Sequence, residues 1–597
     1  MNILNDIKLE IQSALKVIFT YECHLENITL EETIKNYDGF YTFIIFPHTS
    51  NLKQKPEYIG EKLGKYLKVN SSIISDFNVV KGFLNLDLSD NYLISIFNHI
   101  NDHKSWGYKS SSGKEVMVEF SSPNTNKPLH LGHMRNIFLG YSLSKILEAN
   151  GYKVHKVQII NDRGIHICKS MVAWNLFGNN ETPKSSGMKG DKFVGKFYVM
   201  FENEHKKQAA ELVSNGINEE EANVSTDIMK MAKDVLLKWE NKENQTVALW
   251  KKMNGWVYEG FQSTYDLIDV SFDKNYYESE TYLLGKRQIK KGLKNEIFYK
   301  EKDNSVWVDL TEDGYDKKIL LRSDGTSVYM TQDIGTAIKR FEDFPKIKKQ
   351  IYTVGSEQDY HFKILFKILE KLNYNWAKEC FHLSYGMIDL PSGKMKSREG
   401  IVVDADQLIY NMIQTAKKRT NELGKLDDFQ NDNSEDLYNI IALGALKYFL
   451  LKVDPKKRML FDPEESIDFQ GNTGPFIQYT YARILSLIKR GDSLNLDYKN
   501  IDLSKNFQLT NIQKKIINHV YLFSDTIKLS SDMYSPAVIA KYVYELCKLY
   551  NNFYQEDKIF NGKKDVITLF KIKLSYMVSK IIKSALYLLN IKLPNRM

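Results

Sequence analysis

The first 112 residues alternate between helical and strand-like patterns of apolar positions. The N-terminal stretch, MNILNDIKLEIQSALK, has the pattern of an amphipathic helix that carries acids early. Strand-like and helical runs then follow one another at Tyr41 to Phe46, Pro56 to Lys68, Phe83 to Leu88 and Asn91 to Asn101. This pattern predicts a small α/β module over residues 1–112, which ends in the linker-like Ser110-Ser111-Ser112-Gly113.

A strand, a turn and a helix follow the linker. The apolar run Val116 to Phe120 has strand character and breaks at Ser121-Ser122-Pro123-Asn124, because proline cannot continue a central strand. Apolar residues from Met134 to Leu147 then follow helical spacing, and Tyr152 to Ile160 is a second candidate strand. Strand, helix and strand at this spacing predict half of a doubly wound parallel sheet, which gathers ligands at the carboxyl ends of its strands.

Two mostly polar, helical regions lie on either side of the later strand-like runs. The stretch from about 175 to 300 is interpreted as an insertion between the two halves of the sheet, with Glu219 to Glu221 on a solvated helix face. Strand character returns at Val306 to Leu310 and Ile319 to Leu321, and the chain is mostly helical from about 405 onward. We therefore predict an α/β protein of three parts: a small N-terminal domain (1–112), a Rossmann-like domain (113–404) and an all-α C-terminal domain (405–597).

Composition is that of an ordinary soluble globular protein, with 43% hydrophobic and 26% charged residues. The net charge of +8, from 82 basic and 74 acidic residues, permits a polyanionic partner without requiring one. Four widely separated cysteines without a CxxC predict reduced thiols in a cytosolic compartment. The sequence shows neither a signal peptide nor an apolar run of bilayer-spanning length, so we expect a cytoplasmic protein with no membrane partner.

The turn after the first strand of the larger domain contains His130-Leu131-Gly132-His133. A strand, a glycine-containing turn and a helix N-terminus form a place where backbone N–H groups and the helix dipole can meet a phosphate. A bare H-x-x-H is nevertheless usual for surface or capping histidines, and it could be half a zinc site, although no Cys pair or third spaced ligand stands nearby. The Asn161-Asp162-Arg163-Gly164 turn after the second strand forms another wall of the pocket, where Asp162 is either a hydrogen-bonding group or a helix cap.

A second motif far along the chain favours the phosphate-binding interpretation of the two histidines over surface, capping or zinc-binding roles. PNTNKPLHLGH resembles the HIGH motif of class I aminoacyl-tRNA synthetases, and GKMKSREG resembles their KMSKS loop. The Ser-Pro-Asn and the lysine just before HIGH resemble the arginyl-tRNA synthetase family, and the resemblance extends over nearly the whole chain. It implies a class I synthetase catalytic domain, an N-terminal domain that touches the outer corner of the tRNA, and a helical anticodon-binding domain.

The resemblance also implies ATP-dependent activation of L-arginine and its transfer to the 3'-terminal ribose of tRNA(Arg). It assigns His130 and His133 to the phosphates and transition state, and Gly132 to close approach of the adenosine. KMSKS has a lysine where this chain has Ser397, so Lys127 is the expected substitute, and the division of roles among the three lysines stays open. The expected catalytic and ATP-binding residues are Lys127, His130, Gly132, His133, Lys394, Met395, Lys396 and Ser397.

An arginine substrate needs a carboxylate to meet its planar guanidinium fork. Tyr329 and Asp333 are four residues apart, and on a helix such a pair shares a face. The resemblance places substrate-binding roles on Glu119, Asn124, Tyr329, Asp333 and Gln358. Read without the resemblance, an aspartate in this position is more typical of a helix cap or a surface salt bridge.

The C-terminal region carries the candidates for RNA contact. Aromatic residues interleaved with arginine in GNTGPFIQYTYARI can stack on unpaired bases, or can be core packing. From Lys563 to Met597 eight basic residues face the single acid Asp565, which favours an RNA backbone as partner. The expected tRNA-binding residues are Gln478, Tyr479, Tyr481, Arg483, Arg596 and Met597.

The expected substrates are ATP with Mg²⁺, L-arginine and tRNA(Arg), and we expect a monomer with no permanently bound cofactor and no metal cage of its own. Two alternatives compete with this reading. A class I synthetase for another amino acid is disfavoured by the polar pocket, because an apolar side chain would want an apolar one. An RNA-binding protein without catalysis is disfavoured by the presence of both signature motifs.

Overall fold

The computed structural model describes the chain except residues 1, 35, 390–403, 423–433, 504–506, 561 and 597. The described residues form two compact units. The smaller unit contains residues 1–107, 483–525 and 544–582, and the larger contains 108–482, 526–543 and 583–597. Among the described residues, no helix combines the length and apolarity needed to cross a membrane. The predicted domain boundaries near 112 and 404 stay a prediction.

The smaller unit contains a four-stranded antiparallel sheet of order β1-β2-β4-β3, which helices cover. Isoleucines at positions 3, 7 and 11 line the buried face of the first helix, whose N-cap Asn2 accepts a hydrogen bond from the Asn5 N–H. The predicted strand Phe83 to Leu88 is confirmed without a shift. The elements are α1 (Ile3–Phe19), β1 (Leu30–Glu32), β2 (Tyr41–Ile44), α2 (Thr49–Leu52), α3 (Pro56–Asn70), β3 (Ile74–Val80), β4 (Phe83–Leu88), α4 (Asp90–Asp102) and α20 (Asn511–Tyr521).

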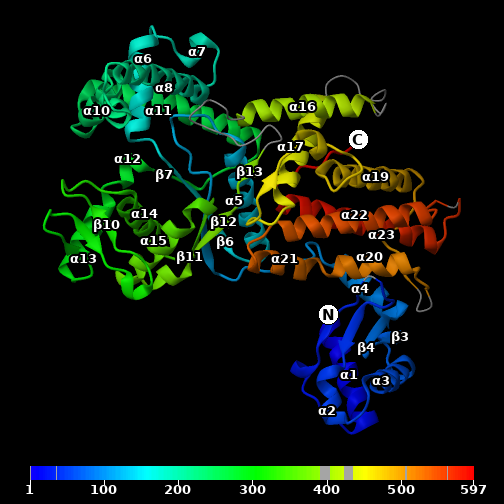
Figure 1. Ribbon diagram of the computed structural model, residues 1–597. Coiled ribbons are helices and arrows are strands. Elements are labelled where there is room, and N and C mark those ends of the chain that lie inside the picture. The colour runs from blue at the N-terminus through cyan, green and yellow to red at the C-terminus, as the bar shows by residue number, and fades with distance from the viewer. Residues whose placement is uncertain are drawn as a thin grey trace. The chain divides into compact units, whose positions relative to one another are not determined.

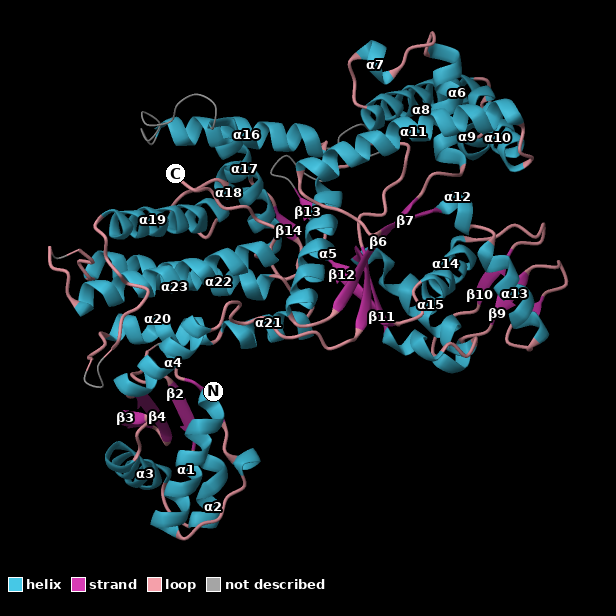
Figure 2. Cartoon of the chain, turned by 180° about the vertical axis from the view of Figure 1, so that it is seen from behind, coloured by secondary structure: helices cyan, strands magenta, loops and turns pink. Residues whose placement is uncertain are grey.

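A five-stranded parallel sheet of order β12-β11-β5-β6-β7 is the centre of the larger unit (Figure 2). The predicted half-sheet is confirmed, because β5 pairs in parallel with β6 and helix α5 connects them. The residues of α5 are buried on nearly all sides of the helix, so it has no broad solvent-exposed face. The bounds are β5 (Glu115–Glu119), α5 (Leu131–Ala149), β6 (Lys153–Ile160), β7 (Lys274–Tyr277), α14 (Tyr329–Asp343), β11 (Ile347–Gly355), α15 (Asp359–Lys371) and β12 (Cys380–Tyr385).

A bundle of helices occupies the chain between β6 and β7 (Figure 1). The acidic run Glu219 to Glu221 lies exposed in the first turn of α9, as predicted for a solvated face. Acidic side chains there also interact favourably with the helix dipole. The helices are α6 (Ile165–Phe177), α7 (Pro183–Ser186), α8 (Gly190–Ser214), α9 (Glu219–Ser225), α10 (Asp227–Glu240) and α11 (Asn244–Leu267).

The strand-like runs near 306 and 319 form a separate three-stranded antiparallel sheet of order β10-β9-β8, outside the parallel sheet. Its apolar face packs with α13 and α14 in one core that includes Ile289, Val308 and Ile334. The elements are α12 (Glu278–Thr281), α13 (Leu284–Lys294), β8 (Tyr299–Lys300), β9 (Val306–Val308) and β10 (Lys318–Leu321).

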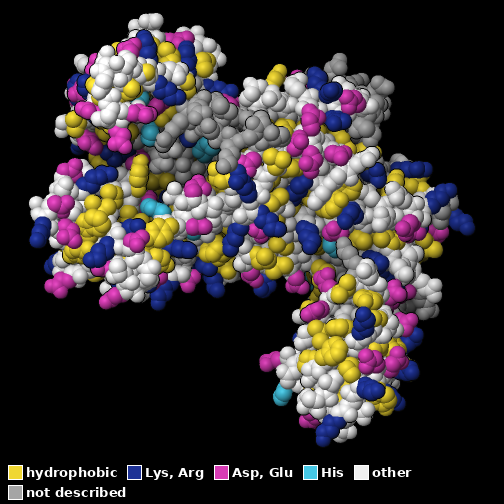
Figure 3. All heavy atoms as spheres, in the orientation of Figure 1, with side chains coloured by type: hydrophobic (Ala, Val, Ile, Leu, Met, Phe, Trp, Pro, Cys, Tyr) yellow, Lys and Arg dark blue, Asp and Glu magenta, His cyan; other side chains and the backbone are white. Residues whose placement is uncertain are grey.

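The helical pattern predicted after residue 405 is confirmed, and in the described residues the short strand β14 interrupts it and pairs with β13, which lies before residue 405. Lys and Arg side chains alternate with Asp and Glu over the face drawn in Figure 3. The elements are β13 (Ile388–Asp389), α16 (Ala405–Glu422), α17 (Ser434–Leu451), β14 (Met459–Leu460), α18 (Pro463–Ser466), α19 (Gly474–Ser493), α21 (Phe523–Asp532), α22 (Ala537–Glu556) and α23 (Val566–Leu588).

Candidate active site

His130 and His133 stand at the N-terminus of α5, at the carboxyl end of the parallel sheet. His130 is the N-cap, and its Nδ1 accepts a hydrogen bond of 3.1 Å from the Gly132 N–H. The His130 N–H in turn donates to His133 Nδ1 at 3.2 Å. Since both Nδ1 atoms accept, each neutral ring carries its proton on Nε2. The corner therefore holds two imidazole N–H donors in fixed orientations.

The charge state of this corner follows from its burial. Burial, together with the positive charge of Lys127, lowers the pKa of His130 to about 3. Burial, with smaller contributions from His130 and Lys127, holds the pKa of His133 well below its usual range. Both rings are therefore neutral at physiological pH, so they act as hydrogen-bond donors and not as cations.

Gly132 is required by the packing of the His130 ring. A Cβ at this position would lie 3.0 Å from His130 Cε1 and 3.1 Å from its Nδ1. Those distances are tighter than ordinary van der Waals contact, and the bond from the Gly132 N–H to the ring holds the ring in place. The glycine keeps the ring folded over the first turn of the helix.

Arg135, on the same helix, is completely buried and bonds only to carbonyl groups among its described partners. Its Nη1 donates to the Gly386 carbonyl at 2.7 Å, and its Nη2 reaches three carbonyls in the 454–457 segment at 2.9–3.3 Å. These carbonyls precede β13 and β14, the strand pair next to the basic loop. Arg135 thus connects the histidine helix to β13, the strand that leads into the loop, and to β14, the strand that pairs with it.

The basic loop with Lys394, Met395, Lys396 and Ser397 lies outside the described residues. The chain is described again from Asp404, which forms a β-bridge with His130. The Ala405 N–H also donates to the Leu129 carbonyl at 3.0 Å. The residues that follow the loop therefore contact the histidine corner directly.

The turn after β6 forms the second wall, as expected. Asn124 is exposed and forms a parallel β-bridge with Asn161. Asp162 is buried, and its carboxylate accepts from the Ser279 N–H at 2.8 Å and from Tyr258 Oη at 2.9 Å. Of the two readings left open for Asp162, it is the hydrogen-bonding group, because the N-cap of α6 is Gly164. Burial raises the pKa of its carboxyl despite these donors.

Three of the five residues expected to bind arginine lie at the starts of two helices beside this wall. Tyr329 and Asp333 occupy the first turn and a half of α14, as their spacing predicted, and Tyr329 is 74% exposed. Asp333 Oδ2 lies 2.6 Å from His361 Nε2 on α15, and Gln358 is exposed at the N-terminus of that helix. The structure therefore brings Asp333, near the start of α14, into contact with His361, which lies three residues after Gln358 at the start of α15.

Glu119 differs from Asp333 because its carboxylate is buried and each of its two oxygens has a hydrogen-bond donor within the chain. It is buried at the end of β5, where its Oε2 accepts a hydrogen bond from Nη1 of the buried Arg340. Ser122 Oγ donates to its Oε1 at 3.0 Å. A contact between Glu119 and the substrate stays a prediction.

Comparison with known proteins decides the family. Residues 95–462 match the family described as tRNA synthetases class I (R), catalytic domain, and residues 477–597 match the DALR anticodon binding domain. The chain is 49% identical to the arginine–tRNA ligase of Amoebophilus asiaticus and 49% identical to that of Flavobacterium psychrophilum, over 100% of both chains in each case. The chain belongs to the arginyl-tRNA synthetase family.

The fold of this chain is similar to solved structures of arginyl-tRNA synthetases. Arginyl-tRNA synthetase of Thermus thermophilus superimposes with a TM-score of 0.76 at 21% identity, and 99% of each chain is covered. The enzyme of Plasmodium falciparum gives a TM-score of 0.74 at 20% identity, with 100% and 99% covered. The class I synthetase fold predicted from the two motifs, with its parallel sheet and helical C-terminal domain, is confirmed.

In the anticodon-binding part of this arginyl-tRNA synthetase family member, the predicted tRNA contacts separate into buried and accessible residues. Gln478 is completely buried, and its Nε2 donates to the carbonyls of Ile440 at 3.0 Å and Lys592 at 2.9 Å. Tyr481 is 8% exposed, and burial raises the pKa of its hydroxyl. These two side chains are packed inside the larger unit, so for them the structure agrees with the core-packing alternative and not with stacking on bases. Tyr479 is half-buried, Arg596 is exposed, and Met597 lies outside the described residues.

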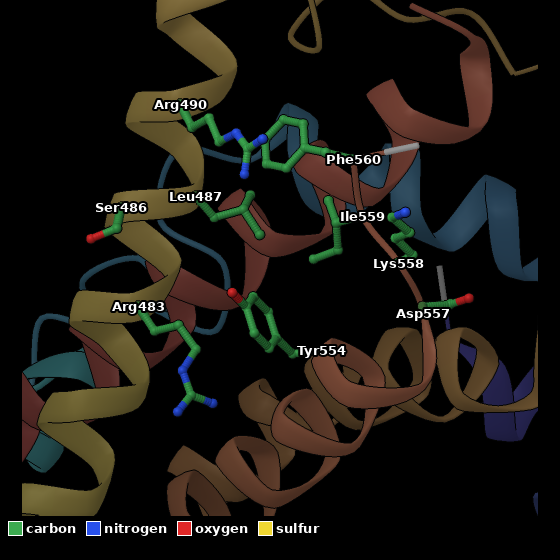
Figure 4. A pocket seen from close by; sticks show the side chains of 9 residues that line it. All are labelled: Arg483, Ser486, Leu487, Arg490, Tyr554, Asp557, Lys558, Ile559 and Phe560. Atoms are coloured by element: carbon green, nitrogen blue, oxygen red, sulfur yellow. The ribbon is translucent and has the colours of Figure 1, made fainter. Parts of the chain in front are cut away.

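Arg483 lines a cavity of about 500 Å³ in the smaller unit (Figure 4). The cavity lies between α19 and the chain that ends α22, and two arginines of α19 face aromatic rings of that segment. Arg483 lies 5.1 Å from the centroid of the Tyr554 ring, and Arg490 lies 4.6 Å from that of Phe560. The remaining lining residues are Ser486, Leu487, Asp557, Lys558 and Ile559. Cationic groups beside aromatic rings suit an unpaired base and its phosphate.

Sequence reasoning missed several partners of the predicted residues. His361 is three residues after Gln358 at the start of the same helix, and this spacing was the available signal. Arg135, Asn136 and Arg340 gave no signal, because a charged or polar residue within a helix reads as an exposed one. Only the fold shows that all three are buried.

Proposed function

We propose that the chain is an arginine–tRNA ligase that couples the cleavage of ATP to AMP and pyrophosphate with the formation of arginyl-tRNA(Arg). The carrying observation is the 49% identity over the whole chain to relatives that bear this name. The enzyme activates the carboxylate of L-arginine by in-line attack on the α-phosphate of ATP. It then transfers the arginyl group to the 3'-terminal ribose of tRNA(Arg).

Catalysis of the first step rests on positioning and on charge stabilisation. His130 and His133 donate their Nε2–H groups to phosphate oxygens, which gain negative charge in the transition state. Their neutrality supports this role, because a neutral donor whose ring is held by backbone needs no rearrangement during the reaction. Gly132 admits the adenosine moiety.

The cationic charge comes from lysines. Lys127 lies close enough to depress the pKa of His130, which supports its role as substitute for the lysine that the signature loop lacks at Ser397. Lys394 and Lys396 neutralise the pyrophosphate side, with Met395 and Ser397 completing the nucleotide contacts. Mg²⁺ arrives with ATP, bound to phosphate oxygens and water as part of the substrate.

Arginine binds at the starts of α14 and α15. Asp333 receives the guanidinium, for which its planar carboxylate is the complementary partner. Tyr329, Gln358 and Asn124 provide further polar contacts, and Glu119 binds the substrate from the end of β5. The exposure of Tyr329, Gln358 and Asn124 supports their access to a substrate.

The tRNA binds along the helical C-terminal region. The Arg483 cavity takes an unpaired base, stacked on Tyr554 or Phe560, while Arg490 and Lys558 neutralise the adjoining phosphates. Tyr479, Arg596 and Met597 add contacts, whereas the buried Gln478 and Tyr481 support them from within. The enzyme acts as a cytoplasmic monomer.

The decisive experiment measures exchange of pyrophosphate into ATP with each of the twenty amino acids, with and without bulk tRNA. Exchange with arginine alone supports the proposal, and dependence on tRNA would add that the acceptor end completes the site. Exchange with another amino acid overturns the pocket assignment. Absence of exchange under every condition favours an RNA-binding protein.

The cavity has its own test. Arg483→Ala and Arg490→Ala should each raise the KM for tRNA about ten-fold, because a stacked base with its phosphate contributes on the order of 1–3 kcal/mol. The KM for arginine and for ATP should not change. Lys541→Ala, a lysine of α22 that does not line the cavity, is the matched control. An unchanged KM for tRNA in both variants would exclude the cavity as a base site.

A further inference from the structure

The second turn of α8, a helix of the insertion, lies directly against the segment that precedes the histidine corner. A Cβ at Gly195 would lie 3.0 Å from Pro128 Cδ and 3.5 Å from Lys127 Cα. The first distance is closer than ordinary van der Waals contact, so a side chain at residue 195 would push this segment away. Gly195 is buried, and the missing side chain lets the helix approach Lys127 and Pro128 closely.

The first turn of the same helix holds the chain that follows the basic loop. Lys192 Nζ lies 3.2 Å from Asp404 Oδ2, and Asp404 forms the β-bridge with His130. The other carboxylate oxygen of Asp404 accepts from the Asp406 N–H at 2.8 Å and so caps the start of α16. The side chains of the lysine and the aspartate are 30% and 20% exposed, so the pair is partly buried. The pair therefore ties the insertion to the histidine corner.

Lys189, the N-cap residue of α8, makes a second connection to this segment. Its Nζ donates to Asp406 Oδ2 at 2.5 Å and to Thr264 Oγ1 of α11 at 2.5 Å. Thr264 Oγ1 donates in turn to Asp406 Oδ1 at 2.9 Å, so both oxygens of that carboxylate have donors. The completely buried Asp191 lies 3.3 Å from the same ammonium group. We call the three residues Lys189, Lys192 and Gly195 the α8 platform.

The α8 platform contacts two segments that are far apart in the sequence and that meet at the histidine corner. One contains Lys127, and the other begins at Asp404. We infer that the α8 platform positions the phosphate side of the activation site: Gly195 seats Lys127, and the platform lysines hold the 404–406 segment against the corner. The inference rests on the proposed roles of Lys127 and the two histidines toward ATP.

The charge of Asp404 gives Lys192 a second role. The backbone of Asp404 is paired with that of His130, whose imidazole N–H is proposed to donate to a phosphate oxygen. An unpaired carboxylate there would repel the phosphates, and such repulsion is stronger in a partly buried site than in water. Lys192 cancels that charge. Loss of Lys192 should therefore weaken the binding of ATP and not that of arginine, which is a cation.

Exchange of pyrophosphate into ATP, measured with arginine and tRNA present and ATP varied, tests the role of Lys192. Lys192→Met keeps an apolar stem of similar length and removes the charge, and we expect the KM for ATP to rise about ten-fold. The KM for arginine should not change. Lys192→Arg keeps the charge and should keep the ATP KM near that of the unaltered enzyme. Lys196→Met, on the same helix and paired with Glu181 at 3.0 Å, is the matched control.

A double variant separates this role from direct binding of ATP by Lys192. Asp404→Asn removes the negative charge and keeps an oxygen that can cap α16. Combined with Lys192→Met it leaves no unpaired charge, so most of the affinity for ATP should return. If Lys192 binds phosphate directly, the double variant keeps the full rise in KM, and the inference is overturned. It is overturned as well if Lys192→Met lowers the temperature of unfolding and leaves the KM for ATP unchanged.

Gly195→Ala tests the contact with Lys127. Alanine favours a helix more than glycine does, so the variant should unfold at the same or a higher temperature. The added Cβ displaces the Lys127–Pro128 segment, and kcat for exchange should fall about ten-fold, because small displacements of a catalytic group are costly. Gly255→Ala of α11 is the matched control, since a Cβ there would meet no described atom within 4 Å beyond its own helix. Equal kcat values in the two glycine variants would show that Gly195 does not position Lys127.

Failure of the inference and failure of the proposed function give different results. His133→Ala and Lys127→Ala are measured in the same assay. If both lower kcat and the α8-platform variants behave like their controls, the phosphate site stands and the inference is wrong. If His133→Ala and Lys127→Ala both leave exchange unchanged, the proposed phosphate site itself is wrong.

Discussion

The histidine corner and the arginine side of the pocket are built in opposite ways. At the corner, each ring is held by backbone atoms and lies over a helix with a completely buried arginine. On the arginine side, Tyr329 is 74% exposed, and Asp333 has a histidine as its hydrogen-bond partner. The groups proposed to meet phosphate are therefore organised before any substrate arrives. The groups proposed to meet arginine gain their full set of partners from the substrate.

The largest effect is expected from breaking the preorganised corner. His133→Ala removes one fixed N–H donor and the acceptor that orients His130, so kcat should fall about 10²–10³-fold, the usual cost of losing a preorganised donor. The KM for arginine should change little, since the ring is not part of the arginine side. His24→Ala, an exposed histidine of the smaller unit, is the control. A variant that loses arginine affinity and keeps kcat would contradict the separation of the two regions.

Breaking the arginine side should change binding instead. Asp333→Asn replaces the charged carboxylate partner of the guanidinium by a neutral amide. The KM for arginine should therefore rise about 10–100-fold. The KM for ATP should stay constant, as steady-state kinetics with each substrate varied would show. Asp309→Asn, a surface carboxylate next to the small antiparallel sheet, is the control. An equal rise in the ATP KM would mean that the two regions are not independent.

Variants of His361, the hydrogen-bond partner of Asp333, should have a smaller effect on the KM for arginine. His361→Gln keeps a side-chain donor for Asp333, whereas His361→Ala leaves that carboxylate without its partner, 2.6 Å away in the present chain. We expect a rise of about three-fold in the arginine KM for the alanine variant and less for glutamine, within the range of one hydrogen bond. Equal KM values for both variants and the unaltered enzyme would show that the histidine does not orient Asp333.

The smallest expected effect concerns pH: His130 and His133 should not change their protonation state near neutral pH, so kcat should not change on their account. Because the pKa of His130 is about 3 and that of His133 is also far below its usual range, neither ring should gain a proton between about pH 6 and 8. These histidines should therefore cause no loss of kcat over that range. The pH profile of single-turnover adenylate formation checks this, and a fall in kcat with a midpoint near 6.5 that disappears in His130→Asn would contradict it.

The same pKa shift makes a prediction about stability with a definite sign. In the unfolded chain His130 binds a proton near pH 6.5, whereas in the folded chain it stays neutral until about pH 3. The unfolded state therefore binds more protons in this window, so the free energy of unfolding falls as the pH drops from 6.5 toward 3. Urea unfolding of His130→Asn should show a smaller fall over the same window. Identical pH dependence in the two proteins would refute the burial effect.

The sequence predicted elements with strong local patterns and missed those defined by neighbours. Strands β5 and β6 and the helix between them were predicted, because their apolar runs are long and their turns contain proline or glycine. β7, β11 and β12 of the same sheet were not. Lysines and polar residues interrupt β11 (IKKQIYTVG), and its place in the centre of the sheet depends on β5 and β12 on either side.

The candidate site shows the same division. Motif residues such as His130 and Asp333 were predicted because the type and spacing of residues carry the chemistry. Arg340 and Asn136 could not be predicted, since nothing in a helical segment distinguishes a buried polar residue from an exposed one until its partner is known. Gln478 illustrates the reverse case: the side chain suits RNA recognition, yet it bonds to two carbonyls inside the larger unit.

Arg135 has a consequence for how the protein is made. Its carbonyl partners lie about 250 to 320 positions further along the chain, so a ribosome has already released the histidine helix long before those carbonyls exist. Until residue 457 has emerged, a buried guanidinium would have no partner, and that cost opposes closure of the helix against the sheet. We therefore expect α5 to reach its final packing only after residue 457 has emerged from the ribosome.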